Sequence, residues 1–175
     1  MIDRRPFRSG LILAIAASVL LVGSAQAARS ASVANVTLSA TTFLHAQQTT
    51  AGTMTLTATD TGPVPLGWNV TIQASAFVYS GLNNGANIPA ANFSLTSAAA
   101  PVFVSGQAID PTNGPKVPAA SPLGPLDVAR KVLQANLLYG VGTYTQALGV
   151  SLTIPAQART GTYTSTLTTT IASGP

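Results

Sequence analysis

The sequence predicts an all-β fold, a single antiparallel β-sandwich built from about seven to eight short strands. Apolar and polar residues alternate with a period of two along most of the chain, as half-buried strands require. Clusters of Gly, Pro, Asn and Asp interrupt this alternation roughly every 8 to 15 residues and supply turns. No helical periodicity of similar strength is present, so a parallel sheet covered by helices is not expected.

The first element is a predicted secretory signal peptide over residues 1–27. Three arginines precede an apolar run over residues 11–22, and the small-residue motif Ala25-Gln26-Ala27 follows it. We expect cleavage after Ala27, which leaves residues 28–175 as a single domain. The alternative is a retained membrane anchor, but the apolar run falls short of the ~20 residues that a spanning helix needs.

After the signal peptide, regular alternation marks a series of strands. Aliphatic residues alternate with threonine and other polar residues, which is typical of strands with one buried face. The residues that mark these strands, in chain order, are Val36, Leu38, Ala40, Met54, Leu56, Ala58, Trp68, Val70, Ile72, Ala74, Phe93, Leu95, Val102, Val104, Leu148, Val150, Leu152, Ile154, Tyr163, Ser165, Leu167, Thr169 and Ile171. We expect an apolar interior behind a hydroxyl-rich exterior.

Turns and loops separate these strands. The turn-forming clusters are residues 60–63, 81–85, 110–115 and 159–161. Residues 105–125, rich in Pro and Ala, predict a long surface loop. Residues 127–138 fit both a helical face and a strand, and we favour a strand because the neighbouring segments are strands. The complete pattern predicts a sandwich of immunoglobulin-like general architecture.

Length and composition favour one domain with a packed core. The chain has 175 residues, of which 46% are hydrophobic and 7% charged. Removing residues 1–27 takes three of the eight basic and one of the four acidic residues, which leaves five and three. So small a net charge, without clustered Lys and Arg, argues against nucleic acid as a partner. The absence of Cys excludes disulfides and thiolate metal sites.

The chain offers few groups for catalysis. It contains one His and no Cys or Glu. A hydrolytic site built from His45, Asp60 and a Ser has no motif spacing, and a lone His is more often a loop or packing residue. Asp60, Asp110 and Asp127 lie in or beside turns, where a carboxylate caps backbone N–H groups. We therefore expect no enzyme activity, no catalytic residue, no bound metal and no cofactor.

Two blocks of sequence resemble the WxL domain of bacterial cell-surface proteins. The first is GWNVTI at residues 67–72, preceded by TDTG at residues 59–62. The second comprises GTY at 142–144, LTIPA at 152–156 and GTYTSTLT at 161–168, in the order and spacing of the family's C-terminal signature.

The resemblance covers roughly residues 33–175, with residues 99–126 unmatched. It implies a WxL-like β-sandwich domain over residues 28–175 that is secreted and attaches non-covalently to the cell wall or cell surface. The implied partner is peptidoglycan or another cell-wall polymer, with no nucleic acid and no membrane span after cleavage. The alternative is a structural or adhesive subunit of an extracellular assembly, which binds other secreted surface proteins without direct glycan binding.

The two W-x-L positions depart from the family pattern. The first reads Trp68-Asn69-Val70, a mild change because Val can fill an apolar Leu site. The second reads Thr169-Thr170-Ile171, so Thr169 stands in the place of the family's second tryptophan. An aromatic face can stack on sugar rings and threonine cannot, so this change removes a possible anchor for the wall polymer.

The candidate ligand-binding residues are Trp68, Asn69, Tyr144 and Tyr163. Trp68 is on the apolar side of its strand, which favours core packing over direct ligand contact. Tyr144 and Tyr163 each follow a Gly-Thr pair at a strand start. Their hydroxyls either close a structural hydrogen bond or face a glycan.

Overall fold

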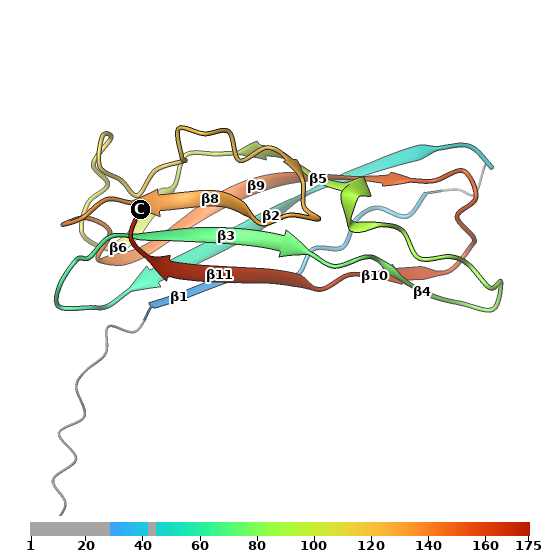
Figure 1. The fold of residues 1–175 in the computed structure, drawn as a ribbon, viewed down its shortest axis with the longest axis horizontal. Helices are drawn as coiled ribbons and strands as arrows, with labels where there is room; N and C mark the ends of the chain where they lie inside the picture. The colour runs from blue at the N-terminus through green and yellow to red at the C-terminus, as the bar shows by residue number, and fades with distance from the viewer. Residues whose placement is uncertain (1–28, 42–44) are drawn as a thin grey trace, which may run out of the picture.

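A computed structural model describes residues 29–41 and 45–175 of the chain (Figure 1). The predicted signal peptide and its cleavage position at Ala27 lie outside the described residues. The predicted all-β, antiparallel, sandwich-like fold is confirmed, and one short 3-10 turn, η1 (Ala90–Asn92), accompanies the strands. Two of the strands are much longer than the short strands that the sequence predicts, with 13 residues each.

The larger sheet is built around these two long strands. Its members are β1 (Arg29–Val33), β2 (Gln48–Asp60), β9 (Gly142–Ile154), β5 (Phe93–Ala98), β7 (Gly124–Pro125) and, beside β5 on the same edge of β9, β6 (Val102–Gly106). β2 and β9 pair along their whole length, from Gln48 opposite Ile154 to Asp60 opposite Gly142. The long ladder therefore fixes which side chains of the two strands share a face.

The opposite layer is smaller (Figure 1). Its three-stranded sheet has the order β11 (Leu167–Ser173), β3 (Trp68–Ala74) and β8 (Arg130–Ala135), and a separate two-stranded sheet pairs β10 (Thr162–Thr164) with β4 (Val78–Ser80). The strand favoured for residues 127–138 is confirmed as β8. A register shift between Val70 and Thr71 leaves Val132 without an opposite residue, and the side chains of Val132 and Leu133 are both buried.

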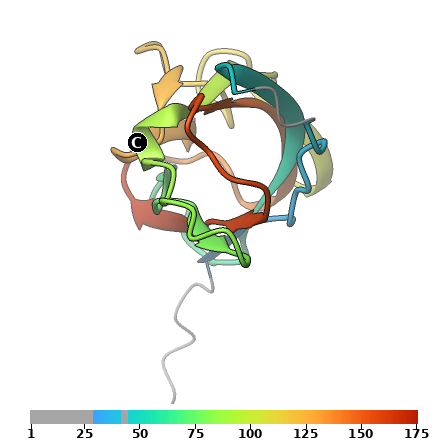
Figure 2. The ribbon, with the colours of Figure 1, turned by 90° about the vertical axis from the view of Figure 1, so that its right-hand side faces the viewer.

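The core forms between the two layers from the predicted alternating residues. The buried apolar residues of β2, β3 and β9 are Met54, Leu56, Ala58, Trp68, Val70, Ile72, Ala74, Tyr144, Leu148, Val150 and Leu152. Figure 2, which looks along the strands, shows the layers wrapped around this interior. β1 and β11 belong to different sheets, so the fold is not a closed barrel.

Residues 34–41 differ from the sequence-based expectation. The alternation of Val36, Leu38 and Ala40 predicts a strand, but β1 ends at Val33 and the following residues belong to no ladder. Val36 and Leu38 are half-buried against the core. They pack against Gly52 on the side of β2 that faces the core. This segment therefore lies over the inner face of β2 and does not pair along its edge.

Candidate functional site

Trp68, the only tryptophan of the chain, lies at the first position of β3 and is completely buried. Its indole Nε1 donates a hydrogen bond to the carbonyl oxygen of Gly140 at 2.9 Å. Gly140 has a φ of +90°, and a Cβ atom at this position would lie 2.7 Å from Nε1. The backbone therefore packs directly on the indole, and the ring has no face open to a ligand.

Tyr144 lies beside Trp68 in the core. The two ring centroids are 6.3 Å apart, and the Tyr144 side chain is fully buried. Its hydroxyl lies within hydrogen-bond distance of the carbonyl oxygens of Gln107, at 2.6 Å, and Val141, at 3.1 Å. Burial raises the pKa of Tyr144 above its ordinary value, and the negative charge of Asp60 adds to this effect. Of the two roles considered for this hydroxyl, the structure shows the structural hydrogen bond.

Asn69 occupies the outward face of β3 and is half-buried. Its side-chain Nδ2 donates to the carbonyl oxygen of Gly174 at 2.8 Å, which ties the end of β11 to β3. Thr169 lies opposite Ile72 in the ladder and alternates with exposed neighbours, so it belongs to the inward-facing side of β11. A tryptophan at position 169 would therefore face the interior rather than an external ligand.

Tyr163 lies in β10, far from the other three candidates. In the β3–β11 ladder, Trp68 and Ser173 form one end, and Ala74 and Leu167 form the other. Tyr163 precedes Leu167 in the chain and lies beyond the Ala74 end, away from Trp68. The half-buried Tyr163 ring packs 5.3 Å from the ring of Tyr79. The four predicted residues therefore do not converge on one site.

The tips of the Tyr163 and Tyr79 rings are anchored to the backbone. The Tyr163 hydroxyl accepts from the N–H of Arg159 at 2.9 Å and donates to the Arg159 carbonyl oxygen at 3.0 Å. The Tyr79 hydroxyl donates to the carbonyl oxygen of Thr160 at 3.0 Å. These bonds fix the turn before β10.

Asp60 forms a buried ion pair that its local sequence does not predict. Its Oδ2 lies 2.9 Å from Nε of Arg29, and Oδ1 accepts from the N–H of Gly62 at 2.9 Å, which confirms the predicted turn cap. The Arg29 Nη1 also donates to the Ser173 hydroxyl at 2.6 Å. These bonds join β1, β2 and β11 at the end where the chain leaves β11. Because the partners are far apart in sequence, only the β1–β2 register could reveal the pair.

Asp110 has the predicted capping role. Its Oδ1 accepts from the backbone N–H groups of Asn113 at 2.7 Å and Thr112 at 2.8 Å. The Asn113 bond is the main cause of a lowered pKa at Asp110. Within residues 29–41 and 45–175, no three His, Asp or Glu side chains come together as metal ligands.

The outward face of the β2–β9 ladder, here called the threonine face, carries mainly hydroxyl-bearing and small side chains. Its residues on the two strands are Thr49, Ala51, Thr53, Thr55, Thr57, Thr59, Thr143, Thr145, Ala147, Gly149, Ser151 and Thr153. Three cross-strand pairs are Thr opposite Thr, and the hydroxyls of Thr59 and Thr143 lie 3.2 Å apart. Each strand contributes 13 residues, so the face is about 40 Å long. It carries no charged side chain.

Strand β6 presents an exposed apolar edge. It pairs with β9 on one side, and all five of its residues are exposed. Val102, Phe103 and Val104 expose 61%, 47% and 55% of their surface. An edge strand with unpaired backbone groups and apolar side chains is able to add another strand.

No protein-family model, curated protein or solved structure matches the chain. Among the residues that the structure describes, no helix has the length and apolar character needed to cross a membrane.

Proposed function

We propose that the chain is a secreted, non-catalytic surface protein that associates non-covalently with the cell wall. The threonine face is the surface that binds peptidoglycan or another wall polymer. The observation that carries this proposal is the long row of hydroxyl and small side chains, free of charge, on the β2–β9 ladder. The resemblance to the WxL domain supports the same assignment.

The chemistry of this face suits a polysaccharide. A threonine hydroxyl both donates and accepts hydrogen bonds, so it can match sugar hydroxyls and amide groups in either direction. An uncharged face avoids the cost of removing water from ions when the polymer docks. A linear polymer can contact successive positions along a face about 40 Å long, and many weak contacts on one chain then act together.

The buried aromatic residues fit a supporting role in this proposal. Trp68 and Tyr144 have no exposed ring face for stacking on sugar rings. Their rings instead pack against each other in the core, where they link β3 to β9. Their replacement would therefore weaken wall binding only by unfolding the domain, whereas replacement of exposed threonines should weaken binding in a folded protein.

A sedimentation assay with purified cell walls tests the proposal. Thr53→Val combined with Thr55→Val removes two exposed hydroxyls while keeping the size and β-branching of the side chains. We expect this variant to bind walls at least threefold more weakly, with an unchanged melting temperature. The matched control is Thr168→Val with Thr170→Val, which removes two exposed hydroxyls from the opposite layer. Equal wall binding by both double variants and the wild type would exclude the threonine face.

A second candidate function is a structural subunit of an extracellular assembly. The exposed apolar edge of β6 favours it, because strand addition there would pair free backbone groups and cover Phe103. Sedimentation velocity at increasing concentration, alone and with co-secreted proteins, tests this role. We expect Phe103→Lys to abolish any association and Thr168→Lys, on the opposite layer, to leave it intact. A protein that stays monomeric and captures no secreted partner would contradict this second function.

A further inference from the structure

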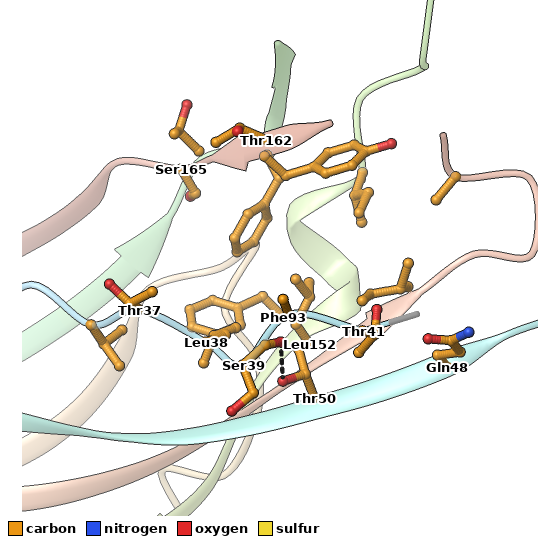
Figure 3. A pocket seen from close by; sticks show the side chains of 18 of the residues that line it. Thr37, Leu38, Ser39, Thr41, Gln48, Thr50, Phe93, Leu152, Thr162 and Ser165 are labelled. Carbon is orange, nitrogen blue, oxygen red and sulfur yellow. Dashed lines mark hydrogen bonds between the residues drawn. The ribbon is translucent and has the colours of Figure 1, made fainter. Parts of the chain in front are cut away.

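A cavity of about 930 Å³ opens at the end of the sandwich away from Trp68 (Figure 3). It lies between the inner faces of β2 and β9 and the segments that precede β2 and follow β9. The apolar side chains on its walls include Met54, Phe77, Ile88, Phe93, Leu152 and Leu167. The rings of Phe77 and Phe93 meet edge to face at 5.3 Å and stiffen one wall.

The shape of the cavity follows from the way the two layers separate. At one end, Arg29 of β1 bonds to Ser173 of β11 and holds the layers together. Away from this end, β1 is followed by residues 34–41, which form no strand, and β11 is preceded by β10. Two unbroken stretches, residues 33–41 and 158–167, line the opening. The opening is thus bordered by two long runs of chain, and a linear molecule can lie along them.

The lining combines an apolar interior with a polar rim and a single charge. Figure 3 shows Leu38, Phe93 and Leu152 grouped in the interior, with hydroxyl-bearing residues such as Thr37 and Thr162 around them. Among the described residues of the lining, Arg159 is the only charged one, none is acidic, and Arg159 itself is exposed at the rim. The guanidinium of Arg159 forms no ion pair within the described part of the chain, and the Tyr163 hydroxyl fixes the Arg159 backbone.

We propose that this cavity binds a linear amphipathic anion of the fatty-acid class. The alkyl chain lies against Phe93 and Leu152, and the carboxylate pairs with Arg159. The volume lies in the range of small-molecule sites, which are mostly apolar with a few polar groups that orient the ligand. Protein interiors are normally packed without large voids, and an alkyl chain would fill this space against the apolar side chains that border it.

Titration of the exported, delipidated protein with cis-parinaric acid, a linear fluorescent fatty acid, tests the proposal. We expect saturable binding of one molecule per chain. Arg159→Gln should weaken binding about tenfold, because a charge-assisted hydrogen bond is lost. Lys131→Gln, which removes a charge outside the cavity, should leave the affinity unchanged. Leu152→Trp should abolish binding by filling the cavity, and Thr162→Trp at the exposed rim serves the same purpose if Leu152→Trp does not fold.

The alcohol of the same chain length separates the contributions of the alkyl chain and the carboxylate. It should bind the wild type as weakly as the acid binds Arg159→Gln. The proposal is overturned if the wild type shows no saturable binding or if the cavity-filling variants bind normally. It is equally overturned if native mass spectrometry finds a peptide or a second copy of the chain in place of the fatty acid.

Discussion

At the scale of single residues, hydrogen bonds of buried polar groups show the structural roles of Trp68 and Tyr144. The sequence pattern alone leaves these roles open between core packing and ligand contact. Trp68 and Tyr144 belong to the two sequence blocks from which a WxL domain is expected, yet both are buried and hydrogen-bonded to backbone carbonyls. Gln107 connects them, because its Oε1 accepts from the N–H of Gly140 at 2.8 Å. The motif residues thus stabilise one end of the fold.

Tyr144→Phe tests this structural role. At neutral pH the variant should lose about 1 kcal/mol of unfolding free energy, since the Gln107 carbonyl loses its closest partner. Because the folded-state pKa of Tyr144 is raised, its contribution to stability is complete below the unfolded pKa of about 10 and is lost as pH rises through the folded pKa. Urea denaturation at pH 7 and above pH 10 should therefore show a larger loss for the wild type than for Tyr144→Phe. Equal losses would contradict the burial of this hydroxyl.

At the scale of elements, the sequence predicts those strands whose alternation continues through a long ladder. The runs at residues 54–58, 68–74 and 148–152 lie in strands with the predicted buried face. The strand predicted for residues 36–40 is wrong. Alternation of apolar and polar residues shows that one side of a segment is buried, but it does not show that the segment pairs with a neighbouring strand. The β5–β9 and β6–β9 register shifts, and the outward alignment of threonines on β2 and β9, depend on pairing between distant segments. No local pattern encodes that pairing.

Gly52 shows how one element depends on another. A Cβ atom at this position would lie 2.8 Å from Cδ2 of Leu38 and 3.4 Å from Cγ2 of Val36. Gly52→Val should therefore displace residues 34–41 and cost about 1–3 kcal/mol, despite the preference of Val for strands. Ala51→Val, on the exposed face of the same strand, should be close to neutral. Limited proteolysis should cleave the Gly52→Val protein faster near residue 38, and equal cleavage rates for the two variants would contradict the packing.

At the scale of the whole molecule, the two layers are joined differently along their two sides. On one side, Arg29, Asp60 and Ser173 connect β1, β2 and β11 near one end, and beyond them the layers separate around the cavity. On the other side, the backbone of Leu126 bonds to both layers. The threonine face and the β6 edge belong to the same sheet, so both proposed functions depend on how this sheet is held against the core.

Leu126 should therefore be critical for the whole sandwich. Its N–H donates to Phe93 of β5 and its carbonyl accepts from Ala74 of β3, both at 2.8 Å, and its side chain is completely buried. Leu126→Ala should cost about 2–5 kcal/mol, because it leaves a cavity where the two layers are joined. Leu123→Ala, at a side chain that is 43% exposed, should change stability by less than about 0.5 kcal/mol. Guanidinium denaturation followed by Trp68 fluorescence measures both values. Similar small losses would show that the layers are held together elsewhere.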